Sequence, residues 1–298
     1  MSASVQIINH GTRLTLPRIE GGAFSMFIGG GRGAGLRIEG PAAGVWLPLR
    51  GRLQVGVGDG ESTHARFEVR ATCADAFTQV TGRGHALWLA MVGTPAAWRE
   101  ALAAGPTRDS GLLPATHQVD RALLRRATSL VRAVQRGDHA VALDGMLDEI
   151  GAMQNRLDEM IARCPGRTWA QRRHVFLRLQ RVREHLACNC HLDLDNAALA
   201  RIASYSPWHF IRAFHAAYHE TPHAFLVRQR LLRAQRLLRT SPLAIGEIAL
   251  ACGFENRCAF SRLFRQRFGT TASALRRHAA SMPMTQQMAT AGMDARAA

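Results

Sequence analysis

Residues 245–269 read IGEIALACGFENRCAFSRLFRQRFG, and a similar pattern stands earlier in residues 196–218, NAALARIASYSPWHFIRAFHAAY. Each copy has a short apolar segment containing an alanine, then a turn, then three aromatic residues at four-residue spacing. These triplets are Phe210, Phe214, Tyr218 and Phe260, Phe264, Phe268. Side chains four positions apart share one face of a helix, and a small residue lets two helices cross closely. The sequence therefore predicts two helix-turn-helix units.

The turns of the two copies carry residues suited to ending one helix and starting the next. Ser206 and Asn256 are predicted to cap the second helix of each unit, with Pro207 in the first turn. Gly253 suits a left-handed backbone conformation in the second copy. Ser204 stands at that position in the first copy, where we expect it to cost about 1 kcal/mol.

The aromatic residues define a buried face on each second helix, so the opposite face is predicted to meet solvent or a partner. Arginine can donate two hydrogen bonds to guanine, and apolar side chains can meet a thymine methyl group. The alternative is a charged face that only meets water. The predicted DNA-contacting residues are Trp208, Ile211, Arg212, His215, Arg257, Cys258, Ala259, Arg262 and Arg265.

A single helix is predicted between the two copies, from Pro222 to about Arg239. At 1.5 Å per residue it would span roughly 26 Å. With the flanking helices, it could hold the two outward faces about one DNA turn apart, near 34 Å. The sequence thus predicts that one chain reads two adjacent major-groove segments.

The charge of the chain supports a polyanionic partner. Of the net +16, residues 171–280 hold +12, from 18 Arg and 6 acidic residues, while residues 1–115 and 116–170 are near balance. Cations that neutralise phosphates release the counterions condensed on DNA, so double-stranded DNA is the predicted partner. A membrane surface is the competing polyanion. The sequence has no run of about 18 apolar residues, and no membrane partner is predicted.

The remaining sequence predicts an α+β protein. Residues 1–115 alternate apolar and polar residues between glycine-rich breaks, which is typical of a small β-barrel or jelly roll. Residues 116–165 form a predicted helical linker, whose apolar stripe is suited either to packing of its helices together or to pairing with another subunit. Residues 166–280 form the predicted all-α domain with both helix-turn-helix units, and residues 281–298 a disordered tail.

The basic domain resembles the AraC/XylS family of bacterial regulators over about residues 175–278. The resemblance is carried by the two copies, by the intervening run Arg230-Leu231-Leu232-Arg233-Ala234, and by Phe260-Ser261-Arg262-Leu263-Phe264-Arg265. Ser204 and Ala272 depart from the family's usual Gly and Pro. The family resemblance implies a cupin-like N-terminal domain that binds a small effector, dimerisation through the linker helices, and a transcription activator that works with RNA polymerase.

Other side-chain groups in the sequence offer alternative sites. A metal-dependent cupin enzyme would need clustered His and carboxylate ligands, but His10, His64 and His85 are isolated, so no enzyme, metal or cofactor is predicted. Trp46, Trp88 and Phe67 could line an effector pocket, although core positions are favoured. Further alternatives are a zinc site at His215, His219 and His223 and a thiol sensor at Cys188, Cys190 and His191.

The six cysteines are scattered along a long chain, which favours reduced thiols over a disulfide framework. Residues 1–10 lack the basic start and apolar stretch of a secretory signal. We therefore expect a cytoplasmic protein.

Overall fold

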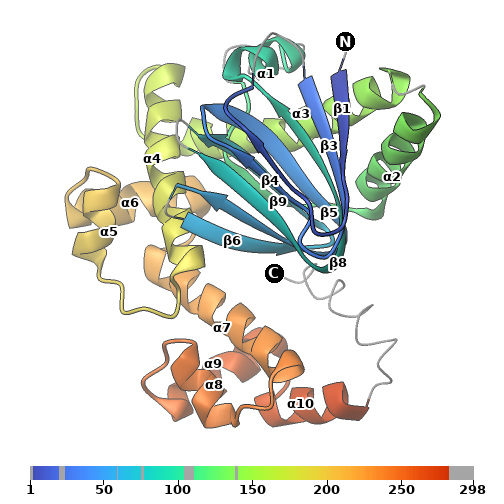
Figure 1. The fold of residues 1–298 in the computed structure, drawn as a ribbon. Coiled ribbons are helices and arrows are strands. Elements are labelled where there is room, and N and C mark those ends of the chain that lie inside the picture. The colour runs from blue at the N-terminus through green and yellow to red at the C-terminus, as the bar shows by residue number, and fades with distance from the viewer. Residues whose placement is uncertain are drawn as a thin grey trace. The chain divides into compact units, whose positions relative to one another are not determined.

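The computed structural model describes residues 3–19, 24–58, 60–74, 77–103, 111–137 and 140–281. The chain divides into two compact units, the first ending at Glu159 and the second beginning at Met160. The first contains a sheet with covering helices and the second is all-helical (Figure 1). The predicted α+β class is confirmed. No described helix has both the length and the apolar character needed to cross a bilayer.

The first unit is built on one mixed sheet whose long central strands pair with each other. These are β5 (Ala42–Val57) and β8 (Thr78–Gly93), antiparallel over their whole length. The ladder is interrupted between Pro48 and Arg52, where Gly51 has φ +74° and a Cβ would lie 3.0 Å from the Ala86 Cα. Each central strand therefore bends and pairs with different neighbours along its two halves.

The remaining strands add to the two halves of this central pair. They are β1 (Ala3–Ile8), β2 (Arg13–Leu16), β3 (Phe24–Gly31), β4 (Gly35–Ile38), β6 (Gly60–Ala65), β7 (Glu68–Ala74) and β9 (Ala115–Gln118). Along β5 lie first β7 and then β6, and along β8 lie first β4 and then β3. Within the described residues no ladder joins the β1 or β2 edge to the β6 or β9 edge, so the sheet bends without closing into a barrel.

Alternation along the strands gives the sheet two different buried faces. One face, inside the bend, holds Trp46 and Trp88, which are buried in one apolar cluster with Leu53 and Val55. We define this as the inner face. Trp46 and Trp88 are thus core residues, as favoured by the sequence, while Phe67 is only partly buried and packs against the other face.

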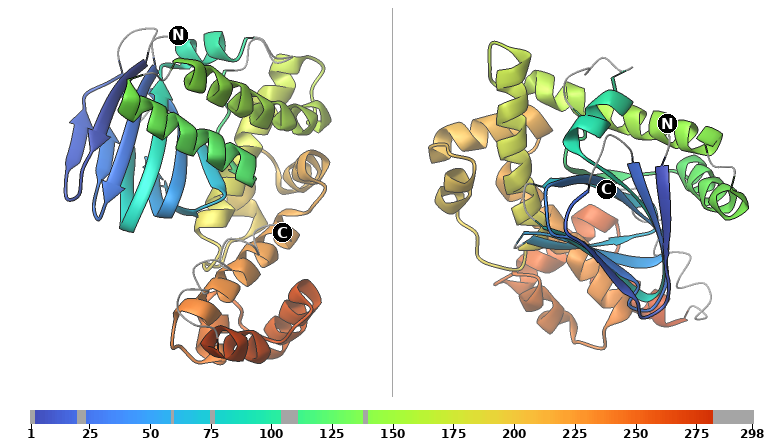
Figure 2. Two further views of the ribbon diagram at one scale, coloured as in Figure 1. Left: turned by 90° about the vertical axis from the view of Figure 1, so that its right-hand side faces the viewer. Right: turned by 45° about the horizontal axis from the view of Figure 1, so that its top comes forward.

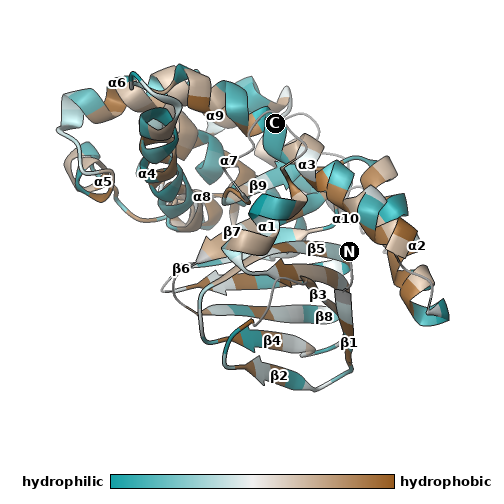
Figure 3. Ribbon diagram, turned by 90° about the horizontal axis from the view of Figure 1, so that it is seen from above, coloured by the Kyte–Doolittle hydropathy of each residue, from teal (hydrophilic) through white to brown (hydrophobic). Residues whose placement is uncertain are grey.

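Helices cover the second, outer face of the sheet: α1 (Pro95–Ala101), α2 (Arg121–Arg136) and α3 (Ala140–Arg163) (Figure 2). Trp98 of α1 is fully buried there, and its indole nitrogen donates to the Ala43 carbonyl at 2.9 Å. The hydropathy colouring of Figure 3 shows hydrophobic and hydrophilic residues alternating along α2. This pattern lets the helix bury one side and expose the other.

The helices predicted as a linker pack within this same core. Leu143, Leu147 and Ile150 of α3 are buried against the sheet, and Arg126 of α2 lies 2.8 Å from Glu149 of α3. In the described parts of α2 and α3, Val141 is the large apolar residue that is exposed to solvent, with 83% of its surface accessible. The predicted apolar stripe is therefore occupied within one chain.

The second unit consists of seven helices in the described region, arranged as two small bundles that share one helix. The shared helix is α7 (Pro222–Thr240), and α4 (Trp169–Cys188) packs on the first bundle. The others are α5 (Asn196–Ile202), α6 (Pro207–Tyr218), α8 (Ile245–Ala251), α9 (Arg257–Phe268) and α10 (Ala272–Ser281). Ser281 closes α10, and the rest of the predicted tail lies outside the described residues.

Helix α7 contributes to the cores of both bundles. Near its start Phe225 packs on Phe214 of α6, with ring centroids 6.1 Å apart. Further along, Leu231, Ala234 and Leu238 are buried in the cluster formed with α8 and α9. Between these two contacts Arg230 donates to the carbonyls of Cys190 at 2.7 Å and Leu192 at 2.9 Å. The single predicted helix over residues 222–239 is thus observed, and it links the two bundles.

The left-handed turn residues give the first testable prediction. Ser204 has φ +55°, so Ser204→Gly should stabilise the protein by about 0.5 to 1 kcal/mol, because glycine lacks the Cβ that strains this conformation. Urea unfolding of the full chain measures the change.

The matched variant at the second turn should act in the opposite direction. Gly253 has φ +86°, and a Cβ there would lie 2.9 Å from the His191 carbonyl oxygen, so Gly253→Ala should lose roughly 1 to 3 kcal/mol. Equal effects of the same sign at the two turns would contradict this account of the backbone.

Candidate nucleic-acid interface

The first helix-turn-helix unit is formed by α5 and α6. Asp195 begins α5 by accepting a hydrogen bond from the Ala198 amide, and the Tyr205 amide donates back to the Ala200 carbonyl at 2.9 Å to close the turn. Ala200 is buried at the crossing. Phe210 and Phe214 of α6 are fully buried, with ring centroids 5.8 Å apart. This burial sets the rotation of α6 about its own axis.

The second unit, formed by α8 and α9, repeats this arrangement. The Phe254 amide donates to the Ala249 carbonyl at 3.0 Å, and Gly253 adopts the left-handed conformation predicted for it. Phe260 and Phe264 of α9 are fully buried, with ring centroids 5.4 Å apart. Both units therefore fix a second helix by the same aromatic burial.

The predicted caps differ in outcome between the two copies. Asn256 Oδ1 accepts from the amides of Cys258 at 2.8 Å and Ala259 at 3.1 Å, so it caps α9 as predicted. Ser206 stands at the N-cap of α6, but its side chain makes no capping hydrogen bond. Instead its hydroxyl lies 2.7 Å from His209 Nδ1, so the prediction for Ser206 was right in position and wrong in bonding.

The residues predicted to meet DNA lie on the outward sides of α6 and α9. Trp208 is 59% exposed, a large apolar surface for a residue in contact with water alone. The Arg212 guanidinium lies over the Trp208 ring, 4.3 Å from its centroid, which holds both side chains on the same outward face. The exposed residues of the set are Trp208, Arg212, His215, Arg257, Cys258, Arg262 and Arg265, whereas Ile211 and Ala259 are half-buried.

The two outward faces differ in chemistry. On α6 the predicted set has one arginine, Arg212, together with aromatic, aliphatic and imidazole side chains. On α9 it has three arginines, Arg257, Arg262 and Arg265. The first face is therefore suited to combined apolar and guanidinium contacts, and the second to contacts with phosphates and guanine edges.

Several other arginines of the basic domain are held by the protein itself. Arg178 donates to the Tyr205 hydroxyl at 3.1 Å, Arg228 forms an ion pair with Glu220 at 2.7 Å, and the Arg183 guanidinium lies over the Tyr218 ring. Arg230 binds two carbonyls, as described above. The sequence assigned the charge as a whole to DNA. These structural roles were missed, because the bonded carbonyls lie up to 40 residues away along the chain.

The alternative of a zinc site rested on His215, His219 and His223. Among the described residues, no group of three or more His, Cys, Asp or Glu side chains is arranged to hold a metal. His215 is exposed near the end of α6, and His219 adopts a left-handed conformation at its C-cap.

The alternative of a thiol sensor rested on Cys188, Cys190 and His191. Cys190 is buried, and this burial raises the pKa of its thiol, which disfavours the reactive thiolate. Cys188 is half-buried.

The helix-turn-helix region of the chain is similar to known proteins. The sequence model described as a helix-turn-helix domain matches residues 199–278. Over 88 residues the chain is 35% identical to the regulatory protein SoxS of Escherichia coli K12, a match that covers 29% of this chain and 82% of SoxS. Over 89 residues it is 43% identical to the HTH-type transcriptional regulator GlxA of Rhizobium meliloti, covering 30% of this chain but only 27% of GlxA.

A solved structure of the DNA-binding domain of AdpA in complex with a target DNA is also similar. The identity is 34%, the match covers 34% of this chain and 91% of that one, and the TM-score is 0.33. Two helix-turn-helix units in a basic domain define a DNA-binding protein. The chain belongs to the AraC/XylS family, and it is a DNA-binding transcription regulator.

Cysteine alkylation gives a direct test of the outward face of α9. When the protein is alkylated at pH 8, the thiols of Cys258 and Cys73 should react quickly because both are exposed. Cys164 and Cys252 should react slowly, since burial raises the pKa of each to about 11 and leaves about one thiol in a thousand ionised.

Bound DNA should protect one of the two exposed thiols. A duplex at about ten times its Kd should slow alkylation of Cys258 by about tenfold, because access is then limited to the unbound fraction. Cys73 in the first unit is the internal control and should react at an unchanged rate. Unaltered alkylation of Cys258 in the DNA complex would remove α9 from the interface.

Proposed function

We propose that the protein is a sequence-specific regulator in which α6 and α9 enter two adjacent major-groove segments of one duplex. One observation carries this proposal: α6 and α9 each expose predicted contact residues on the side opposite a fully buried pair of aromatic residues. At 1.5 Å per residue, the 19-residue α7 between them is about 28 Å long. This length suits two recognition helices separated by about one DNA turn of 34 Å.

The two helices have separate roles in this proposal. Arg212 reads a guanine edge while Trp208 and Ile211 pack against neighbouring bases. Arg257, Arg262 and Arg265 supply base and phosphate contacts on the second segment, with Cys258 and Ala259 allowing close approach, and His215 lies near the backbone phosphates. A contact to guanine is worth about 1 to 3 kcal/mol of discrimination against the wrong base.

The remaining parts of the chain fit a regulated DNA-binding protein. Residues 166–280 are the proposed DNA-binding domain, and residues 1–115 the proposed cupin-like regulatory domain, which responds to a small effector. The apolar stripe of residues 116–165 is buried within the chain, so homodimerisation through these helices would use their exposed surfaces instead. A homodimer would present four groove-reading helices and raise the affinity through linked binding. We further propose activation through contact with RNA polymerase, action in the cytoplasm, and no catalytic activity of its own.

Selection from a random duplex pool near physiological salt tests the DNA-reading proposal. We expect enrichment of two short elements centred about 10 base pairs apart. Arg212→Ala should weaken binding by about 5- to 150-fold and relax the preference within one element, and Arg262→Ala should do so within the other.

The matched control removes one charge from the first unit. Arg99 is an exposed arginine of α1, outside the proposed dimerisation region of residues 116–165, so Arg99→Ala changes the net charge equally without altering either recognition helix. It should leave the selected sequence and its affinity unchanged. If no sequence is enriched and the three substitutions weaken DNA binding equally, the protein is a general polyanion binder instead.

A further inference from the structure

The last turn of α3 belongs to the second unit, because the boundary between the two units falls between Glu159 and Met160 of that helix. Ile161 is fully buried in this turn. The helix ends at Arg163, whose side chain is half-buried. The helix α3 is therefore the element by which the chain passes from the sheet unit into the helical unit.

Arg163 binds the C-terminal end of α6. Its Nε and Nη2 donate to the carbonyl oxygen of Ala217, at 3.4 and 3.2 Å. This carbonyl lies in the last turn of α6, where carbonyl groups have no amide partner within the helix. Ala217 is fully buried, so water cannot take the place of the arginine. The guanidinium thus satisfies a buried backbone group at the end of α6.

The same end of α6 is also tied to α4. The Tyr218 hydroxyl donates to Gln180 Oε1 at 2.9 Å. The start of α6, in contrast, receives no side-chain capping bond from Ser206. The C-terminal end of α6 is therefore its anchored end. Arg212 and His215, from the predicted DNA-contacting set, stand within about two turns of this end.

A second arginine at the same junction makes similar bonds to a different part of the chain. Arg172 of α4 donates to the carbonyls of Ala162 at 3.2 Å and Gly166 at 3.0 Å. The first acceptor is in the last turn of α3, and the second is in the connection from α3 to α4. Arg172 therefore holds the turn between two helices, whereas Arg163 holds the end of α6. The two arginines form a matched pair for experiment.

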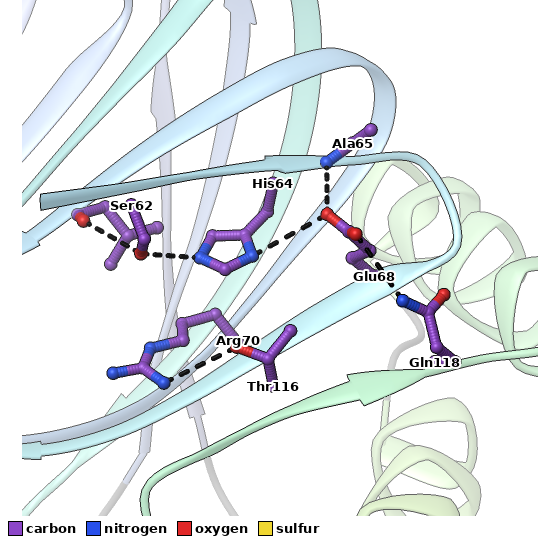
Figure 4. Close-up of polar contacts among 8 residues, drawn as sticks. Ser62, His64, Ala65, Glu68, Arg70, Thr116 and Gln118 are labelled. Atoms are coloured by element: carbon purple, nitrogen blue, oxygen red, sulfur yellow. Dashed lines mark hydrogen bonds and ion pairs between the residues drawn. The ribbon is translucent and has the colours of Figure 1, made fainter. Parts of the chain in front are cut away.

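Polar side chains at the edge of the sheet have a different role, because they link neighbouring strands. Figure 4 shows His64 between two partners, with Nε2 2.7 Å from the Ser62 hydroxyl and Nδ1 3.8 Å from Glu68 Oε2. In the same view Arg70 Nη1 lies 3.5 Å from the Thr116 hydroxyl. These contacts hold strands of one sheet together. The arginine at the end of α3 instead acts on a helix that carries predicted DNA contacts.

We propose that Arg163 is a positioning residue of α6, so that reading of the first DNA segment depends on the last turn of α3. The bond to Ala217 favours one placement of the helix end, and with it one placement of Arg212 and His215 on the DNA. Without this bond α6 can shift, and binding then relies more on the contacts of α9. The inference rests on the proposed reading of two DNA segments. It adds a residue that acts on one segment alone, and it assigns the first segment as the one that responds to changes along α3.

The affinities of the full-length protein for three duplexes test the proposal. The first is the selected duplex, the second has a base substituted in the element read by α6, and the third has a base substituted in the element read by α9. The elements are assigned by the effects of Arg212→Ala and Arg262→Ala. The ratio of the affinities for the selected and the substituted duplex measures the discrimination in each element.

Arg163→Met keeps the aliphatic stem of the side chain and removes every hydrogen-bond donor. We expect it to lower the discrimination in the α6 element about two- to tenfold, which corresponds to the net worth of one hydrogen bond. The discrimination in the α9 element should stay unchanged.

The matched control is Arg172→Met, which removes two bonds to carbonyls at the same junction and should leave the discrimination in both elements unchanged. Arg163→Lys retains a charged donor and should restore most of the lost discrimination. If Arg163→Met does not fold, Arg163→Lys alone decides the outcome. Its single ammonium replaces two donors, so the discrimination should still fall in the α6 element and not in the α9 element.

Unchanged discrimination in the α6 element of a folded Arg163→Met protein would overturn the positioning role. An equal loss in both elements, or the same loss with Arg172→Met, would also overturn it, because either result indicates a general effect of the junction on folding. If the unsubstituted protein discriminates in neither element, the DNA-reading proposal fails and this inference fails with it. If the unsubstituted protein discriminates in both elements and Arg163→Met changes neither, only the role of Arg163 is lost.

Discussion

The arrangement of the helical domain depends on α7 belonging to two cores at once. Its Phe225 packs against α6, while Leu231, Ala234 and Leu238 are buried with α8 and α9. A helix is stiff over this length, so neither aromatic bundle can rotate without disturbing the packing of the other. The Arg230 side chain strengthens this link by binding the carbonyls at 190 and 192. Sequence-specific reading of two groove segments requires such a fixed relation, since the groove positions themselves are fixed by the DNA helix.

The basic charge of the domain serves two purposes that only the structure separates. One set of arginines, on the outward sides of α6 and α9, is exposed and suited to nucleic acid. Another set, including Arg178, Arg183 and Arg230, binds carbonyls, hydroxyls or aromatic rings within the protein. Such arginines stabilise the scaffold by satisfying backbone groups and by cation–π contact. Net charge therefore overstates the number of groups available to phosphate.

The sequence predicted the features that depend on local spacing. The two helix-turn-helix units, the left-handed turns at Ser204 and Gly253, the cap at Asn256 and the buried faces of α6 and α9 all follow from residues a few positions apart. The features it missed depend on distant pairing. These include the bend at Gly51, the packing of α2 and α3 on the sheet, and the meeting of Arg70 with Thr116 from another strand. Ser206 shows a third limit, because its hydroxyl had two local partners and bonded to His209 rather than to the backbone.

If one chain reads two DNA segments held at a fixed distance, changing the distance between those segments should weaken binding. The affinity would be measured for the selected duplex and for duplexes with 5 or 10 base pairs inserted between its two elements. An insertion of 5 base pairs turns the second element by about half a helical turn to the opposite face of the DNA. We expect either insertion to reduce the affinity to that of a duplex with one intact element, because α7 cannot lengthen. Unchanged affinity with both insertions would show instead that the two helices read DNA independently of each other.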